Sequence, residues 1–246
     1  MTAPRPLALG DSHFNYSDYT AARFLHYFQS VHHVMALHPK SLLEIGPGDH
    51  TVSDFFARKG VTVRTFDNDE RLRPDYIGDL REPLPISERF DVVLASEVFE
   101  HFQFADLERI LRNIEPVLGP RGHLVVSLPY STIRLFPPRP RYGRVLSCEG
   151  RLHTGMPTYV IQAGLTVARG FYRTVRLREH PRKAFAFYRS FPNYPADRHD
   201  VHHWDLGVWP TTRRRVRQVF ARFFDVIDER PYLGTNCVFF VLQARS

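Results

Sequence analysis

The chain is poor in cysteine and has no long apolar run. Its two cysteines, Cys148 and Cys237, lie far apart and fit no C-x-x-C pattern, so a disulfide framework is not expected. No apolar stretch approaches the roughly 20 residues that a membrane-spanning helix needs. The first residues, MTAPRPLALG, lack the basic and apolar regions of a secretory signal. From these absences we expect a soluble, cytoplasmic protein.

Lysine is also scarce, so the positive charge comes almost entirely from arginine. The only lysines are Lys40, Lys59 and Lys183, although the net charge is +7. An arginine-rich chain of this charge is compatible with an anionic partner such as RNA, because the guanidinium fork binds phosphates and carboxylates. The sequence contains no recognisable RNA-binding module and no basic tail. An RNA partner and an ordinary arginine-rich surface therefore both stay open.

Strands and helices alternate through the first half of the chain. We expect helices at 17–37, 50–60 and 105–118, and strands at 41–46, 61–67, 76–79, 89–96 and 120–129. Towards the end we expect an amphipathic helix with its N-cap near Thr211, followed by strands at 225–233 and 236–244. The segment Val92–Ala95 is apolar on both faces, as a buried parallel strand requires. The alternation predicts a parallel sheet covered by helices.

The regular pattern stops between residues 130 and 207. This segment is rich in proline, arginine and aromatic residues, and it is too long for a simple loop. We interpret it as an inserted substrate cap. The core domain would then consist of residues 1–129 and 208–246.

A glycine loop, EIGPGDHT, follows the first expected strand. Glycines there let the backbone turn closely against a ligand. Thr51 stands where a dinucleotide-binding fingerprint has its third glycine, and no G-x-x-x-x-G-K-[ST] string exists, so a P-loop is excluded. Acidic residues mark the expected strand ends: Glu44 suits an ammonium group, Asp67 a ribose diol, and Asp79 an exocyclic amine.

The order of the strings LLEIGPGDH, VTVRTFD, IGD, RFDVVLASEVFEH and PRGHLVVSLP resembles the class I S-adenosylmethionine-dependent methyltransferases, most closely the small-domain type 11 group. The resemblance covers roughly residues 41–129. It implies an α/β fold: a Rossmann-like, seven-stranded, mostly parallel sheet with a C-terminal antiparallel hairpin. It also implies S-adenosyl-L-methionine as cofactor and S-adenosyl-L-homocysteine as product. The cofactor-binding residues that it implies are Glu44, Gly46, Gly48, Asp67, Asn68, Asp79, Leu80 and Ser96. His50 departs from the pattern, which usually has a small residue there.

The string SEVFEH places Glu97, Glu100 and His101 after the fourth expected strand, where this fold brings the methyl group and the acceptor together. On a helix, their spacing would put all three on one face. The string can cap a short helix, with Ser96 as N-cap. Glu97 or His101 can instead be a general base for a hydroxyl acceptor. The spacing E-x-x-E-H also resembles ubiquinone-pathway O-methyltransferases and small-RNA 2′-O-methyltransferases, in which such residues hold a divalent metal.

A second group of histidines lies in RHDVHHWDLG, where the expected cap rejoins the core. His202 or His203 can contact the acceptor, and we count His203 with Glu97 and His101 as catalytic candidates. The string can equally be a surface histidine run with Trp204 as a buried anchor.

The sequence thus predicts methyl transfer to an oxygen or nitrogen atom of a small-molecule or glycan-type acceptor. The aromatic residues of the expected cap suit a closed, partly apolar pocket. Two alternatives stay open. One is an RNA methyltransferase, with or without metal assistance, and the other is a non-catalytic partner subunit with a methyltransferase fold.

Overall fold

The computed structural model describes residues 21–130, 139–141, 144–146, 171, 174–176, 202–207, 211–232, 235 and 237–245. The strands are β1 Ser41–Ile45, β2 Thr62–Asp67, β3 Tyr76–Ile77, β4 Phe90–Ser96, β5 Leu118–Pro129, β6 Arg139–Arg141, β7 Arg144–Leu146, β8 Phe224–Tyr232 and β9 Cys237–Ala244. The α-helices are α1 Ala21–Met35, α2 Thr51–Ala57, α3 Leu107–Ile114 and α6 Arg213–Phe223. Short 3-10 helices are η3 Glu70–Leu72, η4 Phe99–His101, η5 Phe104–Asp106 and η6 Glu115–Val117.

Seven of the strands form one mixed sheet in the order β3-β2-β1-β4-β5-β9-β8. The pairs formed among β1 to β5 are all parallel, whereas β9 runs antiparallel to both β5 and β8. A parallel neighbour needs a crossover, which the helical segments after β1 and β4 supply. The predicted seven-stranded, Rossmann-like sheet with a C-terminal antiparallel hairpin is therefore confirmed.

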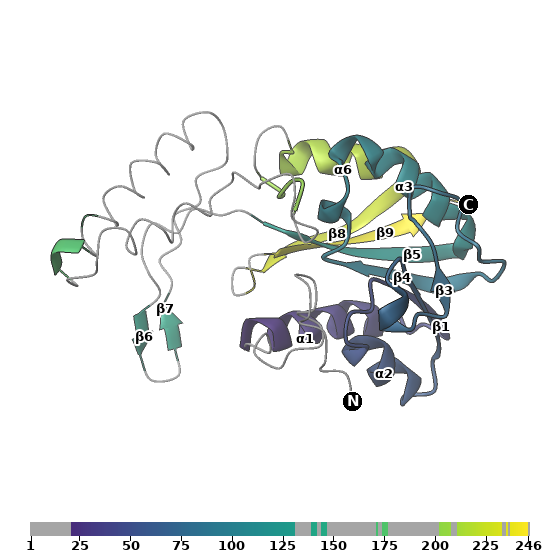
Figure 1. Ribbon diagram of the computed structural model, residues 1–246, viewed down its shortest axis with the longest axis horizontal. Coiled ribbons are helices and arrows are strands. Elements are labelled where there is room, and N and C mark those ends of the chain that lie inside the picture. The colour runs from purple at the N-terminus through teal and green to yellow at the C-terminus, as the bar shows by residue number, and fades with distance from the viewer. Residues whose placement is uncertain are drawn as a thin grey trace, which may run out of the picture.

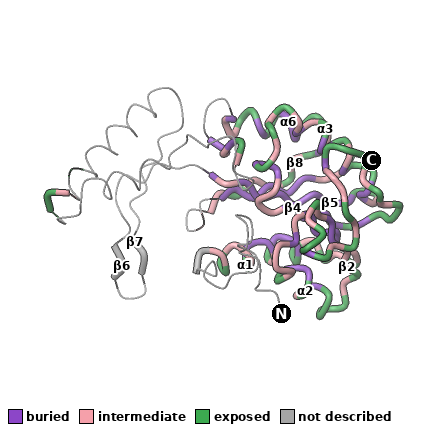
Figure 2. The backbone as a smooth tube through the Cα atoms, in the orientation of Figure 1, coloured by how far each residue is buried: buried purple, intermediate pink, exposed green. Residues whose placement is uncertain are grey.

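Helices cover both faces of this sheet. Figure 1 shows α1 and α2 on one face and α3 and α6 on the other. Successive side chains of β4 alternate between two apolar cores: Val92 and Leu94 pack on the side of α1 and α2, and Val93 and Ala95 on the other side. The central strands are accordingly buried along most of their length (Figure 2). This double burial explains why the β4 sequence is apolar at consecutive positions.

The helix α6 attaches the C-terminal hairpin to the core. Its residues Val216, Val219 and Phe220 are buried, and the Phe220 ring lies 5.1 Å from that of Phe240 on β9. The N-cap is Thr212, one residue after the expected position, and its hydroxyl accepts from the backbone N–H of Arg215 at 3.3 Å.

The chain leaves and re-enters the core at neighbouring points. Tyr130 forms a parallel bridge with Leu206, whose backbone N–H donates to the Pro129 carbonyl at 2.9 Å. Most of the segment between them lies outside the described residues, so the substrate cap at 130–207 stays a prediction. Among the described residues, no helix combines the length and apolarity needed to cross a membrane.

Candidate active site

The expected site residues converge at one edge of the sheet. Ile45, near the end of β1, is in register with Phe66 on β2 and with Ala95 on β4. The residue that follows each of these three in sequence lies at the carboxyl edge of the sheet, which is where open α/β sheets bind their ligands. Those next residues are Gly46, Asp67 and Ser96.

The glycine loop between β1 and α2 has left-handed backbone at every second residue from Gly46 to His50. Gly46 has φ 69°, and a Cβ atom there would lie 2.7 Å from the Cγ2 atom of Val98. Gly48 and His50 also have positive φ, at 54° and 62°. His50 then serves as the N-cap of α2, and its Nε2–H donates to the Leu72 carbonyl at 2.6 Å. His50, which stands where the family pattern usually has a small residue, thus adopts a backbone conformation that usually favours glycine.

Glu44 is a buried acid beside this loop. The side chain is 4% exposed, and its Oε2 atom has no hydrogen-bond partner among the described residues. Burial raises the pKa of Glu44 to about 8, although hydrogen bonds with Ser53 oppose the shift. A buried acceptor without a donor is costly unless a ligand satisfies it. Glu44 is therefore suited to hold a cationic group.

The next two strand ends carry the other predicted cofactor ligands. Asp67 accepts the backbone N–H of Asp69 at 2.8 Å, and Asn68 between them is exposed. Asp79 holds Arg81 with both carboxylate oxygens, at 3.0 Å to Nε and 2.6 Å to Nη2. The Arg81 hydrogen bond lowers the pKa of Asp79. An amine bound to Asp79 would therefore share the Asp79 carboxylate with Arg81. The adjacent Leu80 is buried.

Ser96 does not cap a helix, which corrects one interpretation of the sequence. The N-cap position of η4 is Val98, which makes no side-chain cap bond. The Ser96 hydroxyl instead lies 2.8 Å from Nε2 of His26, and 3.1 Å from the hydroxyls of both Ser30 and Ser127. These contacts join α1 to the ends of β4 and β5.

Glu97 lies outside the short helix that carries Glu100 and His101. Its φ of 55° breaks the helical geometry, and η4 begins only at Phe99, so the expectation of one helical face for all three residues is wrong. Ser127 holds Glu97 in place: its hydroxyl accepts from the Glu97 backbone N–H at 3.0 Å and lies 3.1 Å from Oε1. Burial raises the pKa of Glu97 to about 7.

Glu100, His101 and His202 form a compact group. Glu100 is 0% exposed, and neither carboxylate oxygen has a hydrogen-bond partner among the described residues. Burial, reinforced by the charge of Glu97, raises the pKa of Glu100 well above its ordinary value. His202 Nε2 lies 3.9 Å from Glu100 Oε1, and one ligand atom from each of the three residues lies within 4.8 Å of the others. The third member is thus His202, whereas Glu97 is not part of the group.

The segment around His202 is fixed against η4. His202 Nδ1 lies 3.0 Å from Asp205 Oδ1, which turns the other ring nitrogen towards Glu100. His203 donates its backbone N–H to the Glu100 carbonyl at 2.7 Å, and its ring contacts Gln103 instead. Trp204 is buried and donates to the Phe102 carbonyl at 3.0 Å, which confirms it as an anchor. The catalytic role of His203 stays a prediction.

Sequence reasoning missed His26, Ser30 and Ser127. His26 and Ser30 lie on a helix that precedes every recognisable motif, so no local pattern marks them. Ser127 did carry a signal, because it is a lone polar residue in the apolar run LVVSLP and is 0% exposed.

Comparisons with known proteins agree with this geometry. The family described as "Methyltransferase domain" matches residues 17–164. The ubiquinone biosynthesis O-methyltransferase of Azorhizobium caulinodans is 33% identical over 109 residues, which are 39% of this chain and only 42% of that relative. The N-methyltransferase NodS from Bradyrhizobium japonicum WM9, solved with S-adenosyl-L-homocysteine, covers 97% of both chains with a TM-score of 0.53 and 11% identity.

A second solved structure also shares the fold. The glycopeptide N-methyltransferase MtfA, complexed with S-adenosyl-L-homocysteine, aligns over 88% of this chain and 89% of its own, with a TM-score of 0.51 and 15% identity. The family match covers more than half of the chain, and the seven-stranded mixed sheet is shared with the solved methyltransferases. The chain belongs to the class I S-adenosylmethionine-dependent methyltransferases.

Proposed function

We propose that this protein transfers the methyl group of S-adenosyl-L-methionine to an oxygen or nitrogen atom of a small-molecule or glycan-type acceptor. The observation that carries the proposal is Glu44, a buried carboxyl beside a glycine loop at the carboxyl edge of the sheet, whose Oε2 atom has no hydrogen-bond partner in the described part of the chain. An ammonium group, such as that of the cofactor's methionine part, would satisfy this acceptor.

The other strand ends supply the remaining cofactor contacts. Gly46 and Gly48 supply the positive-φ positions of the loop assigned to the cofactor's methionine part, and the Asp67 carboxylate can accept both ribose hydroxyls. Asn68, Asp79 and Leu80 lie further along the same edge and are assigned to the adenine. Ser96 is assigned to the methionine end because it closes β4, next to β1.

The chemistry requires little more than alignment and removal of one proton. Methyl transfer from a sulfonium is an in-line displacement, so the protein mainly orients the acceptor and excludes water. Glu97 is the preferred general base, because its pKa of about 7 allows it to accept a proton near neutral pH. Ser127 fixes the direction of its carboxylate. His101 and His203 are kept as the other candidates.

The choice of a small acceptor is supported by the relatives' names. The curated relative is named for ubiquinone biosynthesis, and a solved neighbour is named as a glycopeptide methyltransferase. The test is transfer of radiolabelled methyl from S-adenosyl-L-methionine into a fractionated cell extract. We expect label in small molecules or glycans, and at least about tenfold less label with Glu97→Gln. Label in RNA alone would contradict the proposal, and bound cofactor without any label would favour the partner-subunit alternative.

A divalent metal is a second candidate, favoured by one observation. Both oxygens of Glu100 are buried without a hydrogen-bond partner among the described residues, and one ligand atom each of Glu100, His101 and His202 lies within 4.8 Å of the others. Carboxylate and imidazole together suit Mn²⁺ or Mg²⁺. Such an ion would polarise an acceptor oxygen when bound.

Calorimetric titration with Mn²⁺ tests this candidate without an activity assay. We expect one saturable site in the intact protein, lost in Glu100→Gln and kept in Glu108→Gln, which removes an acid on α3. A site that survives Glu100→Gln, or no saturable binding, would remove the metal from the account.

A further inference from the structure

His50 stands at the end of the glycine loop, at a position whose backbone geometry favours glycine. Its φ of 62° and ψ of 12° are left-handed, and this conformation costs free energy for any residue that has a Cβ atom. His50 is also the N-cap of α2, but its side chain makes no cap hydrogen bond. Neither the turn nor the helix therefore accounts for a histidine here.

The imidazole of His50 reaches the loop that follows β2. Its Nε2 atom lies 2.6 Å from the carbonyl oxygen of Leu72, the last residue of η3. Because a carbonyl oxygen only accepts, Nε2 carries the hydrogen, and Nδ1 of the neutral ring is an acceptor. The Ser53 hydroxyl lies 3.4 Å from Nδ1, and Ser53 also hydrogen-bonds Glu44. Both ring nitrogens thus have a partner.

The bond to Leu72 joins two loops with separate roles in the proposed cofactor site. Leu72 is buried, and its backbone N–H donates to the carbonyl of Asp69, the N-cap of η3, at 3.0 Å. The backbone N–H of Asp69 donates to Oδ1 of Asp67 at 2.8 Å. The segment from Asp67 to Leu72 is therefore one hydrogen-bonded unit, and His50 connects this unit to the glycine loop.

We propose that His50 is a positioning residue of the cofactor site, which ties the loop assigned to the ribose to the loop assigned to the methionine part. The inference rests on the proposed function, because that function assigns both loops to the cofactor. Loops that are already joined lose less conformational freedom when a ligand binds, so the tie strengthens binding by preorganisation. This role requires no contact between His50 and the cofactor.

The tie should affect cofactor affinity more than folding stability. Glycine at position 50 removes the hydrogen bond to Leu72, but it also relieves the strain of the left-handed backbone. These two effects oppose each other in the stability of the folded chain. Only the loss of the bond changes how the two loops are held together.

Calorimetric titration of the full-length protein with S-adenosyl-L-homocysteine tests the proposal. We expect about fivefold weaker binding in His50→Gly. His50→Gln should restore most of the affinity, because its amide nitrogen is as many bonds from Cα as the imidazole Nε2 and can donate to Leu72. The matched control is His38→Gly, which replaces an exposed histidine at φ 48° and should bind as the unaltered protein does.

Hydrogen exchange of the ligand-free protein gives an independent readout of the tie. The amides of Leu72 and Arg73 donate to the carbonyls of Asp69 and Glu70, each at 3.0 Å. We expect both amides to exchange several-fold faster in His50→Gly, and at the unaltered rate in the control variant.

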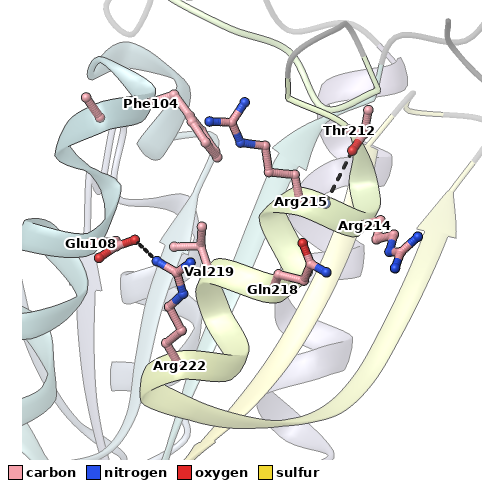
Figure 3. Close-up of a pocket in the computed structure, with 9 residues that line it drawn as sticks. Phe104, Glu108, Thr212, Arg214, Arg215, Gln218, Val219 and Arg222 are labelled. Atoms are coloured by element: carbon pink, nitrogen blue, oxygen red, sulfur yellow. Dashed lines mark hydrogen bonds and ion pairs between the residues drawn. The ribbon is translucent and has the colours of Figure 1, made fainter.

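A hollow between α3 and α6 offers the cofactor another place to bind, and the same titration distinguishes the two places. Its volume is about 430 Å³, and Phe104, Glu108 and Gln218 are among the residues that line it (Figure 3). None of the described residues assigned to the cofactor lines this hollow. Gln218→Ala should therefore bind S-adenosyl-L-homocysteine as the unaltered protein does.

Four results would contradict the role of His50. Equal affinity in the unaltered protein and His50→Gly would overturn this inference and leave the proposed function standing. Equally weak binding in His50→Gly and His50→Gln would show that the bond to Leu72 is not what matters. Weaker binding in Gln218→Ala alone would place the cofactor in the hollow. Absence of binding by the unaltered protein would overturn both the inference and the proposed function.

Discussion

At the scale of single residues, the burial and the raised pKa of Glu44 make it suited to a cationic ligand. The sequence places it two residues before Gly46, and the fold buries it with one oxygen that no described residue hydrogen-bonds. Because its pKa of about 8 lies above that of an exposed glutamate, ionisation favours the unfolded chain. This residue therefore adds stability below about pH 4.5, and that stability is lost as the pH rises towards 8. A bound ammonium group would reverse the preference for the neutral form.

The affinity for S-adenosyl-L-homocysteine should therefore depend on pH. If the ligand's ammonium group needs the Glu44 carboxylate, binding releases a proton, and affinity should rise roughly 20-fold between pH 6 and pH 7.5. Calorimetry across this range provides the measurement. Glu44→Gln should bind more weakly and show a much flatter pH dependence, and an unchanged dependence in this variant would contradict the role of Glu44.

We expect alanine to be tolerated much less well at Gly46 than at Gly60, although both glycines have positive φ. Gly46→Ala adds a Cβ atom 2.7 Å from Val98 and strains φ, whereas Gly60→Ala at φ 82° meets nothing within 4 Å. We expect a loss of about 2–4 kcal/mol of unfolding free energy for Gly46→Ala and about 1–2 kcal/mol for Gly60→Ala. Urea denaturation compares the two, and equal losses would show that the approach of Val98 is unimportant.

At the scale of elements, α1 is the helix whose buried face does not follow from its apolar sequence pattern. Gln29, Ser30 and His33 are buried against the sheet, while Phe24 and Phe28 are 56% and 64% exposed. Polar contacts tie the helix down: His26 reaches Ser96, and His33 lies 3.0 Å from the Tyr232 hydroxyl. Apolar periodicity would assign the opposite face to the core.

We expect acidic pH to destabilise the packing of α1 through protonation of His26. Burial, aided by Arg23, lowers the pKa of His26 to about 4, so protonation favours the unfolded chain. The stability contributed by neutral His26 is present above about pH 6.5 and is lost as the pH falls towards 4. Between pH 7 and pH 5 the unaltered protein should lose about 2 kcal/mol more than His26→Leu. The control is His32→Leu, which replaces an exposed neighbour and should lose as much stability between pH 7 and pH 5 as the unaltered protein. An equally large loss in His26→Leu would contradict the assignment of the pH effect to His26.

Elements with a strong internal pattern could be predicted from the sequence, and contacts between distant elements could not. The strands β1, β2, β4 and β5 lie where their apolar runs place them, because both faces of the sheet are buried. The geometry of the SEVFEH string was misread because the left-handed backbone at Glu97 has no sequence signature. His202 meets Glu100 only because the chain returns beside Pro129.

At the scale of the whole molecule, the parallel half of the sheet brings the residues proposed for the cofactor to one edge. The strands β2, β1 and β4 are successive neighbours in the sheet although their ends are separated in sequence, so Glu44, Asp67 and Ser96 lie at or near adjacent strand ends. The helices α3 and α6 lie on the face opposite α1 (Figure 1).

The most direct test of the account is calorimetric titration of the full-length protein with S-adenosyl-L-homocysteine. We predict one bound molecule per chain, with affinity reduced about tenfold or more in Asp67→Ala, which removes the acceptor assigned to the ribose hydroxyls. Asp54→Ala is the control, since it removes an exposed acid of α2 whose carboxylate lies 3.8 Å from Arg58 at the surface. No binding by the unaltered protein, or equal affinity in Asp67→Ala, would contradict the assignment of this edge to the cofactor.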